Sequence, residues 1–536
     1  MSADPAASSF SSRLGRGPVL YPTAGRRTGH DSAVGWWRRN VHAACAGLLT
    51  VLAAAAYCGY ALVQYRTFRT STYDLVIFDQ AVRSYAHLQP GISAAKGMHN
   101  GPGPYFPVLG DHWSPVIAVL APLYWLPGLD GPRTLLVAQG ALFALAIPPV
   151  WMFARRVAGP RWGAATGYLA AGAYALCWPV AEAVAFGFHE VAFVPVLSAV
   201  FLERLEAGRV RVALLAAGAL LLVKEDMGLL VAGFGLFVLA GRRGVPRRRS
   251  RWLLGAALIA GGIGAAVLAT FVLRPAFGGR ADYYWGYWSL GPNLPQAAGH
   301  ALTHPLAAAQ LLITPRVKLH TMLWLFGALL FLPLASPVSL AAVPLLAERM
   351  LASSDPGWWG VRYQYNAFLA VVLVCAAVDG AATLRRFAAW AGTRRLAAGR
   401  VLAGAGGLPA AIVPAAAGLA CAAAVALVGR FAFGAALHPA FYQLTARDRG
   451  AAAAVAAVPP HVTVEAANRL GPQLSARTNV LLWDWYPRWA PWVAADTGQQ
   501  TFPFTSLGAQ LQRVALLERS GYRVVLARDG YIVLHR

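Results

Sequence analysis

Apolar runs long enough to cross a bilayer recur along the chain and alternate with short polar segments. A transmembrane helix needs about 20 mostly apolar residues, so each run is a candidate span. The pattern predicts eleven transmembrane helices, at residues 41–63, 135–153, 163–181, 190–203, 212–223, 227–240, 252–273, 321–333, 337–347, 366–379 and 408–429. The chain is therefore expected to be a polytopic α-helical membrane protein.

Basic residues sort the loops between these spans into two sets. The loops 155–161, 204–211, 242–251 and 385–400 are rich in Lys and Arg, whereas 182–190 carries none. Because cytoplasmic loops carry the excess of Lys and Arg, the basic set and the Arg-rich N-terminus are predicted to be cytoplasmic. The loops 64–134 and 274–320 and the C-terminus are then extracytoplasmic, in a plasma-membrane protein.

The short spans 212–223 and 227–240 allow two interpretations. As a hairpin, they place Lys224, Glu225 and Asp226 at an extracytoplasmic tip. As one continuous helix, they bury three charges within the membrane, which is costly. The hairpin is favoured because it also keeps the flanking basic loops on one side.

The pattern changes at both ends of the chain. Residues 1–40 are Arg-rich with little hydrophobic periodicity, which predicts a disordered basic cytoplasmic tail before the transmembrane region 41–429. Residues 430–536 predict a small extracytoplasmic α/β domain, with helices at 442–457 and 507–519 and strands near 462–465 and 480–483. Its last segment predicts a hairpin turning at Asp529-Gly530.

Composition supports a membrane protein, because 57% of the residues are hydrophobic and 13% are charged. The net charge of +24 lies mainly in loops and comes with no nucleic-acid-binding motif, so no nucleic-acid partner is expected. The five cysteines all fall in apolar runs without CxxC spacing, which predicts free thiols rather than a disulfide framework or a zinc site.

The first outer loop concentrates acidic residues in YDLVIFDQ and GDHWSP. Asp79 is a candidate general base, although an Asp before a helix at Gln80 is equally typical of an N-cap. Asp74 can orient Asp79, help to hold a cation or satisfy a turn. Asp111 and His112 precede a predicted interfacial helix opened by Ser114-Pro115, and His112 is either a substrate ligand or a solvated interfacial residue.

Further charged residues fall on the same predicted outer side. FHE supplies His189 and Glu190, and KED supplies Lys224, Glu225 and Asp226; charged groups beside apolar spans indicate a site unless they pair structurally. A structural bridge from Lys224 to Glu190 or Glu225 is the plain alternative. Weaker cationic candidates are Arg316, Lys318 and Arg362. The aromatic run at 283–288 is either an interfacial belt or the border of a groove for lipid or sugar.

An outward-facing transferase has no sugar nucleotide at hand, so its glycosyl donor would be a polyprenyl-phosphate sugar in the bilayer. Such a site needs a carboxylate to take the proton of the acceptor hydroxyl, and cations or a metal for the leaving phosphate. A divalent cation is compatible with this chemistry, but the motifs identify no certain cofactor and no metal ligands.

Five motifs in order, YDLVIFDQ, GDHWSP, FGFHE, LLLVKEDMGL and GYRVVLARDGYIVLHR, resemble the membrane-protein family called domain of unknown function 2079 over about residues 57–536. That family is grouped with the GT-C polyprenyl-phosphate-dependent glycosyltransferases, including the protein mannosyltransferase and aminoarabinose transferase branch. The resemblance implies that Asp79 is the catalytic base and that the donor phosphate lies near Lys224. Asp79-Gln80 departs from the Asp-Glu pair common in those enzymes, and one Pro stands where they often have two.

These observations predict an inverting glycosyltransferase that transfers a sugar from a polyprenyl-phosphate donor to a glycan, lipid or protein acceptor outside the cell. In that prediction Asp74, Asp111 and His112 position the substrates, and Lys224 with Arg316 stabilises the phosphate. The alternatives are a transporter or lipid flippase, for which an internal repeat would be typical, and a non-catalytic membrane scaffold.

Overall fold

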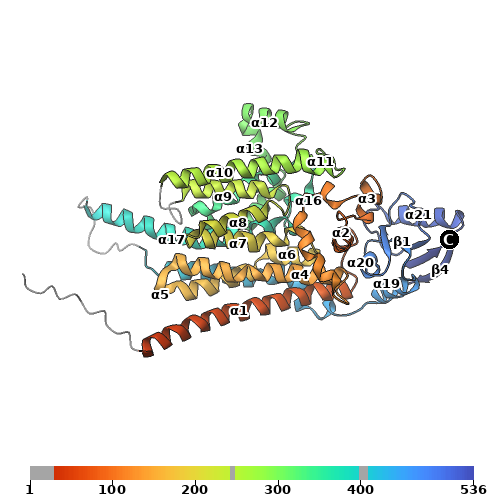
Figure 1. The fold of residues 1–536 in the computed structure, drawn as a ribbon, viewed down its shortest axis with the longest axis horizontal. Helices are drawn as coiled ribbons and strands as arrows, with labels where there is room; N and C mark the ends of the chain where they lie inside the picture. Colours follow the sequence, from red (N-terminus) through yellow and green to blue (C-terminus); the bar gives the residue numbers. More distant parts are fainter. Residues whose placement is uncertain (1–28, 242–247, 398–407) are drawn as a thin grey trace, which may run out of the picture. The chain divides into compact units, whose positions relative to one another are not determined.

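A computed structural model describes residues 29–241, 248–397 and 408–536 (Figure 1). The chain divides into two compact units at Cys45 and Ala46, and the site and fold features below belong to the second unit. The predicted disorder of residues 1–40 lies mostly outside the described residues. Its last part is wrong, because helix α1 (Gly29–Arg66) already begins at Gly29.

Helices make up most of the described chain, as predicted for a helical membrane protein. The principal ones are α2 (Leu75–Ala86), α3 (Ala94–Asn100), α4 (Pro132–Leu145), α5 (Ile147–Leu176), α6 (Trp178–Phe186), α7 (Phe193–Glu206), α8 (Val210–Leu220), α9 (Met227–Ala240), α10 (Arg248–Leu268), α12 (Leu294–Thr303), α13 (Pro305–Leu311), α14 (Arg316–Gly327), α15 (Val343–Leu351), α17 (Ala367–Ala397), α18 (Ile412–Leu427), α19 (Ala446–Ala457) and α21 (Leu507–Arg519). Short turns α11 (Arg274–Ala276), α16 (Pro356–Trp359) and α20 (Gly471–Leu474) connect them.

Five stretches of the described residues are long and apolar enough to cross a membrane: 40–66, 132–186, 248–276, 364–391 and 412–430. The second stretch covers two of the predicted spans, which meet where Gly159 leaves helical geometry before Pro160. The other predicted spans fall on shorter helices such as α8 and α9, so the number of crossings stays a prediction.

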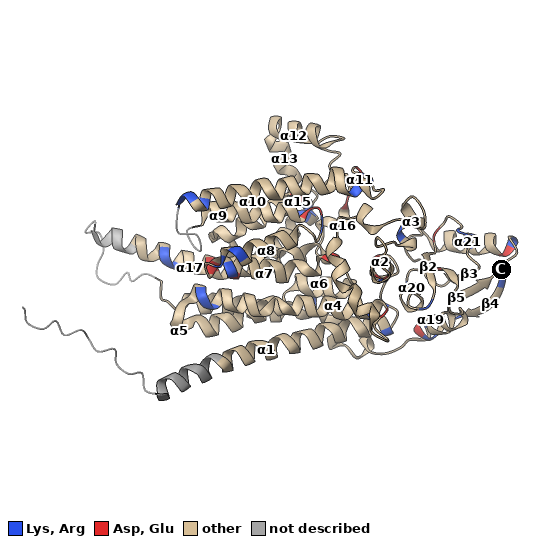
Figure 2. Ribbon diagram, in the orientation of Figure 1, with Lys and Arg blue, Asp and Glu red and all other residues tan. Residues whose placement is uncertain are grey.

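The break between α8 and α9 excludes one continuous helix over 212–240. The chain leaves helical structure after Leu220 and resumes it at Met227, so Lys224, Glu225 and Asp226 lie on a turn, as the hairpin interpretation predicts. Figure 2 shows Lys and Arg at the starts of α8 and α10 and around the break at Gly159 within α5, all away from the sheet, and KED is at the opposite end of α8 and α9.

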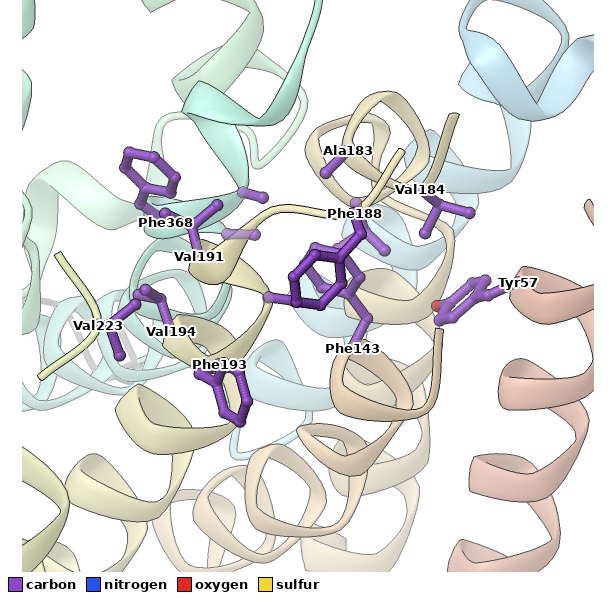
Figure 3. Packing of buried hydrophobic residues seen from close by; sticks show 14 of the residues in the cluster. Tyr57, Phe143, Ala183, Val184, Phe188, Val191, Phe193, Val194, Val223 and Phe368 are labelled. Atoms are coloured by element: carbon purple, nitrogen blue, oxygen red, sulfur yellow. The ribbon is translucent and has the colours of Figure 1, made fainter. Parts of the chain in front are cut away.

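Apolar packing joins the helices into one core. Tyr57 of α1, Phe143 of α4, Phe193 of α7 and Phe368 of α17 are all buried in a single cluster (Figure 3). Phe188, in the turn after α6, is completely buried in the same cluster. Packing of Phe188 in the core therefore fixes the FGFHE turn, and with it the positions of His189 and Glu190.

The C-terminal segment forms a five-stranded sheet. Its strands are β1 (Thr463–Ala466), β2 (Asn479–Leu482), β3 (Trp492–Asp496), β4 (Arg523–Arg528) and β5 (Tyr531–His535), in the order β2-β1-β3-β5-β4. The first three are parallel neighbours, and β5 runs antiparallel to β3 and β4. Both turn residues of the last hairpin have positive φ, 47° at Asp529 and 83° at Gly530, as the Asp-Gly pair predicts. Strand β3 was missed.

Buried hydrogen bonds fasten this sheet to the first outer loop. Thr72 donates its backbone N–H to the carbonyl of Asn468 at 2.6 Å, and the Gln80 amide donates to the carbonyl of Val480 at 2.8 Å. At the end of α1, the Gln473 amide donates to the carbonyl of Tyr65 at 2.6 Å. The C-terminal domain thus sits directly on the loop that carries YDLVIFDQ.

Candidate functional site

Asp79 lies inside α2 and points into the protein rather than into a cavity. Its carboxylate is 0% exposed and accepts hydrogen bonds from the hydroxyl of Tyr124, at 2.7 Å, and from that of Ser475. Arg83, one turn on, lies 3.4 Å away. Burial raises the pKa of Asp79, and Arg83, Ser475 and Tyr124 partly offset that rise. The residue therefore ties α2 to the C-terminal domain, which differs from both the expected base and the alternative helix cap.

Asp74 takes the N-cap position of α2 instead, with its side chain free for other contacts. It has φ 72° and ψ −71°, and its carboxylate makes no capping hydrogen bond. A positive φ is unusual for a non-glycine residue and marks stored strain, which often accompanies a functional role. Its side chain is 26% exposed, and Oδ2 lies 3.6 Å from Nε2 of His189.

The turn after α6 presents His189 and Glu190. The side-chain oxygen of Gln139 accepts the backbone N–H of His189 at 3.0 Å, and the ring stacks on Phe186 with centroids 5.0 Å apart. Burial alone would lower the pKa of His189, but the carboxylates of Asp74 and Glu190 hold it above its ordinary value. Nδ1 of His189 and Oε2 of Glu190 are buried without a hydrogen-bond partner, which is unusual for buried polar atoms.

The KED turn meets the GDHWSP segment. Oε1 of Glu225 lies 2.8 Å from Nδ1 of His112, and Oε2 accepts the backbone N–H of Trp113 at 3.1 Å. His112, Lys224 and Arg274 overcome the effect of burial and lower the pKa of Glu225. The charge of Glu225 is therefore neutralised locally, and His112 is a positioned site residue rather than a solvated one.

Lys224 lies 3.4 Å from Asp226, whose Oδ1 is buried and unpartnered. Burial would lower the pKa of Lys224, but the neighbouring carboxylates, Asp226 first, raise it, so the ammonium stays charged. Tyr365 lies within electrostatic reach of both Lys224 and Asp74. The hairpin tip and the loop that carries Asp74 therefore lie close to each other around Tyr365.

Asp111 binds a lysine that sequence reasoning missed. Nζ of Lys96, in α3, lies 2.9 Å from Oδ1 of Asp111, and the hydroxyl of Tyr284 donates to the same oxygen at 2.7 Å. Although burial opposes it, Lys96 and His112 lower the pKa of Asp111. The ring of Tyr284 also stacks on His112, with centroids 4.6 Å apart. The aromatic run at 283–288 therefore contacts Asp111 and His112 through Tyr284. Lys96 could not be predicted, because nothing in the sequence around it distinguishes it from a surface lysine.

The three weaker cationic candidates lie outside this cluster of contacts. Lys318 is fully buried and donates to the carbonyls of Leu311, Met350 and Ala352 at 2.7–2.8 Å, which uses all three of its hydrogens. Arg316 and Arg362 are exposed. Across residues 29–241, 248–397 and 408–536, no group of three or more His, Cys, Asp or Glu side chains is arranged to hold a metal ion.

The fold defines a helical membrane protein whose C-terminal α/β domain contacts the loop that carries Asp74 and Asp79. The sequence matches the family described as "Predicted membrane protein (DUF2079)" over residues 64–533, and the chain belongs to that family. The resemblance inferred from the five motifs is thus confirmed. No curated protein matches the sequence.

Solved structures with a similar arrangement are glycosyltransferases. ArnT from Cupriavidus metallidurans bound to undecaprenyl phosphate is 15% identical, with a TM-score of 0.47 over 91% of this chain and 97% of that one. The Archaeoglobus fulgidus oligosaccharyltransferase tethered with an acceptor peptide is 12% identical, with a TM-score of 0.38; the match covers 93% of this chain and 74% of that one. The archaeal oligosaccharyltransferase AglB from the same organism, in complex with an inhibitory peptide and a dolichol-phosphate, is 12% identical, with a TM-score of 0.36. That match covers 91% of this chain and 73% of that one.

Proposed function

We propose that this protein is a membrane glycosyltransferase that moves a sugar from a polyprenyl-phosphate donor to an extracytoplasmic acceptor with inversion at the anomeric carbon. The observation that carries the proposal is that Asp74 lies 3.6 Å from His189, and that the next residue, Glu190, lies within electrostatic reach of Lys224. A catalytic carboxylate and a phosphate-binding cation are what such a transfer requires.

Asp74 is assigned as the general base in place of Asp79. Its carboxylate is partly exposed and has no hydroxyl partner, whereas Asp79 is fully buried and already accepts two hydroxyl hydrogen bonds. The strained backbone and the neighbouring His189 fix the direction of the Asp74 side chain. A base of this kind contributes about 10²–10⁴-fold to the rate.

In the reaction, the acceptor oxygen attacks the anomeric carbon while Asp74 takes its proton. The bond between that carbon and the phosphate oxygen breaks, and the departing polyprenyl phosphate carries the bonding electrons. Lys224 faces the added negative charge on the phosphate, with a side chain that is 12% exposed. The unpartnered atoms of His189, Glu190 and Asp226 are suited to the hydroxyls of the sugar.

The sidedness required by this function is part of the proposal. The N-terminus is cytoplasmic, and the site and the C-terminal domain face outward. The separation in Figure 2 supports it, because the basic starts of α8 and α10 and the basic break within α5 lie away from the sheet. A divalent cation at the donor phosphate remains compatible with this scheme, and the chain offers Lys224 as its own counter-charge.

The test compares envelope glycans and glycolipids of a deletion strain complemented with wild type, Asp74→Asn or Asp79→Asn. We expect the Asp74 variant to fail at normal protein level and the Asp79 variant to restore the product in proportion to its level. The pair is matched because both remove one carboxylate from the same loop. Full rescue by Asp74→Asn would refute the catalytic role and favour a scaffold, and a defect only in lipid distribution between leaflets would favour a flippase.

A further inference from the structure

Four aromatic side chains form a continuous strip from the site onto the C-terminal domain: Tyr73, His99, Phe502 and Trp485. The ring of Tyr73 lies 5.5 Å from that of His99 and 5.2 Å from that of Phe502, between centroids. His99 in turn lies 6.4 Å from Trp485. Phe502 and Trp485 are each 45% exposed. Single exposed aromatics are ordinary, but a contiguous set on a soluble domain indicates a binding surface.

Hydrogen-bonding groups accompany the strip at its inner end. The hydroxyl of Tyr73 accepts from Nζ of Lys96 at 3.2 Å and from the amide of Asn100 at 3.4 Å. Lys96, Asn100 and Asp111, with Arg280 and Tyr283, line a cavity of about 280 Å³. That volume is near the lower end of the roughly 300–1,000 Å³ typical of small-molecule sites. The inner end of the strip therefore adjoins, through Lys96 and Asn100, a hollow of mixed polar and apolar lining that is large enough for one small ring.

Its position relates the strip to the reaction. Tyr73 immediately precedes Asp74, and its backbone N–H donates to the side chain of Asn468 at 3.1 Å. The C-terminal domain thus holds both the outer end of the strip and the residue next to the proposed base. A molecule lying along the strip would bring its inner end to Asp74.

We propose that the aromatic strip and the adjoining cavity bind a carbohydrate acceptor. This inference rests on the proposed function and names its acceptor class. A sugar ring has apolar C–H faces and a rim of hydroxyls, so it matches the exposed rings of Phe502 and Trp485 and the polar side chains that line the cavity. A lipid chain offers no hydrogen-bonding groups to those side chains, and the strip has no free sheet edge of the kind that binds extended peptides.

The experiment measures binding of defined oligosaccharides to the full-length protein in detergent. The probes are tri- to pentasaccharides of hexose, N-acetylhexosamine and pentose, followed by saturation-transfer NMR and calorimetry. We expect at least one to bind, and Trp485→Ala or Phe502→Ala to weaken it by about tenfold or more, as truncated aromatic anchors do. Trp485→Phe should retain most of the affinity. Trp489→Ala is the matched control, because Trp489 is 47% exposed in the same loop and outside the strip.

Several outcomes would overturn the inference. One is that no oligosaccharide binds, and another is that Trp485→Ala binds as wild type does. Unglycosylated peptides or lipid vesicles that bind instead, and lose binding in Trp485→Ala, would reassign the surface. Asp74→Asn separates this inference from the proposed function, because transfer by that variant tests the base whereas oligosaccharide binding by Trp485→Ala tests the strip. Binding by the strip in a protein whose Asp74→Asn form still transfers sugar would overturn the function but not the binding surface.

Discussion

Replacing Asp79 with Ala should destabilise the protein by uncoupling the first outer loop from the C-terminal domain. The carboxylate is 0% exposed and is shared by the hydroxyls of Tyr124 and Ser475 and by Arg83. Each hydroxyl left without an acceptor in the interior costs about 1–3 kcal/mol. Breaking a buried charged pair costs about 3–5 kcal/mol.

Alternative partners reduce this cost for two of the three donors. Tyr124 also lies 3.4 Å from the carbonyl of Gly131, and Arg83 also donates to the carbonyl of Asp130 at 2.5 Å. The hydroxyl of Ser475 donates to no other acceptor among the described residues, so it takes the largest penalty. We therefore expect a loss of about 2–5 kcal/mol for Asp79→Ala. Asp79→Asn keeps an acceptor and removes a buried charge, so its loss should be about 1–2 kcal/mol.

The assay is thermal unfolding of the full-length protein in detergent, with limited proteolysis to follow release of the C-terminal domain. A change of 1 kcal/mol shifts Tm by about 2–4 °C in domains of 150–250 residues, so Asp79→Ala should lower Tm by several degrees. Ser475→Ala, made in wild type and in Asp79→Ala, completes a double-mutant cycle. We expect a coupling energy between Asp79 and Ser475 of about 0.5–3 kcal/mol. A wild-type Tm for Asp79→Ala, or additive effects with Ser475→Ala, would refute the anchoring role.

Four further outcomes are expected. Lys224→Ala should lower single-turnover transfer from a polyprenyl-phosphate sugar by about 10²–10³-fold, and Lys224→Arg should recover part of it; equal rates for all three would exclude phosphate stabilisation. Burial raises the pKa of Asp79 in the folded protein, so this residue stabilises the folded state at low pH. That contribution is lost as the pH rises through the raised pKa. The difference in Tm between wild type and Asp79→Asn, wild type minus variant, should therefore fall from acid to neutral pH. Lys96→Met strands the buried Asp111 carboxylate and should cost about 3–5 kcal/mol, seen as a lower Tm that Lys96→Met/Asp111→Asn largely restores. Gly530→Ala, at φ 83°, should cost about 1–2 kcal/mol in the same assay, while Gly508→Ala within α21 should not lower Tm.

Local patterns predicted the elements whose residues determine their own conformation. The Asp529-Gly530 turn, the helix at 507–519 and the break at KED each depend on neighbours in sequence, and the structure has all three. Strand β3 was hidden because Trp492–Asp496 is short and follows a segment of Pro and aromatic residues. Ser114 was expected to cap its helix, but its hydroxyl donates to the carbonyl of His112 and the helix is 3₁₀ (Pro115–Trp125).

The site could be predicted in outline but not in its inner arrangement. Motif chemistry predicted a shared site for Asp74, His112, His189 and Lys224, because charged residues beside apolar spans need a shared polar environment. It did not predict that the protein buries Asp79 and leaves Asp74 partly exposed, since five residues along a helix entry turn the two carboxylates to different faces. That choice depends on where Ser475 lies, almost 400 positions later in the chain. Lys96 was missed for the same reason. It pairs with Asp111 because the folded loop brings the two side chains together, and their spacing in the sequence does not predict that contact.

The hydrogen bonds from Thr72 and Tyr73 to Asn468 also have a consequence for biosynthesis. Chains are made from the N-terminus, so the loop that carries Asp74 is translocated long before the residue that clamps it exists. Until the last part of the polypeptide has emerged and folded, Asp74 lacks the contacts that hold its unusual backbone. Under the proposed function, a nascent or truncated protein would thus occupy the membrane without transferring sugar, and activity would begin only when the C-terminal domain has folded.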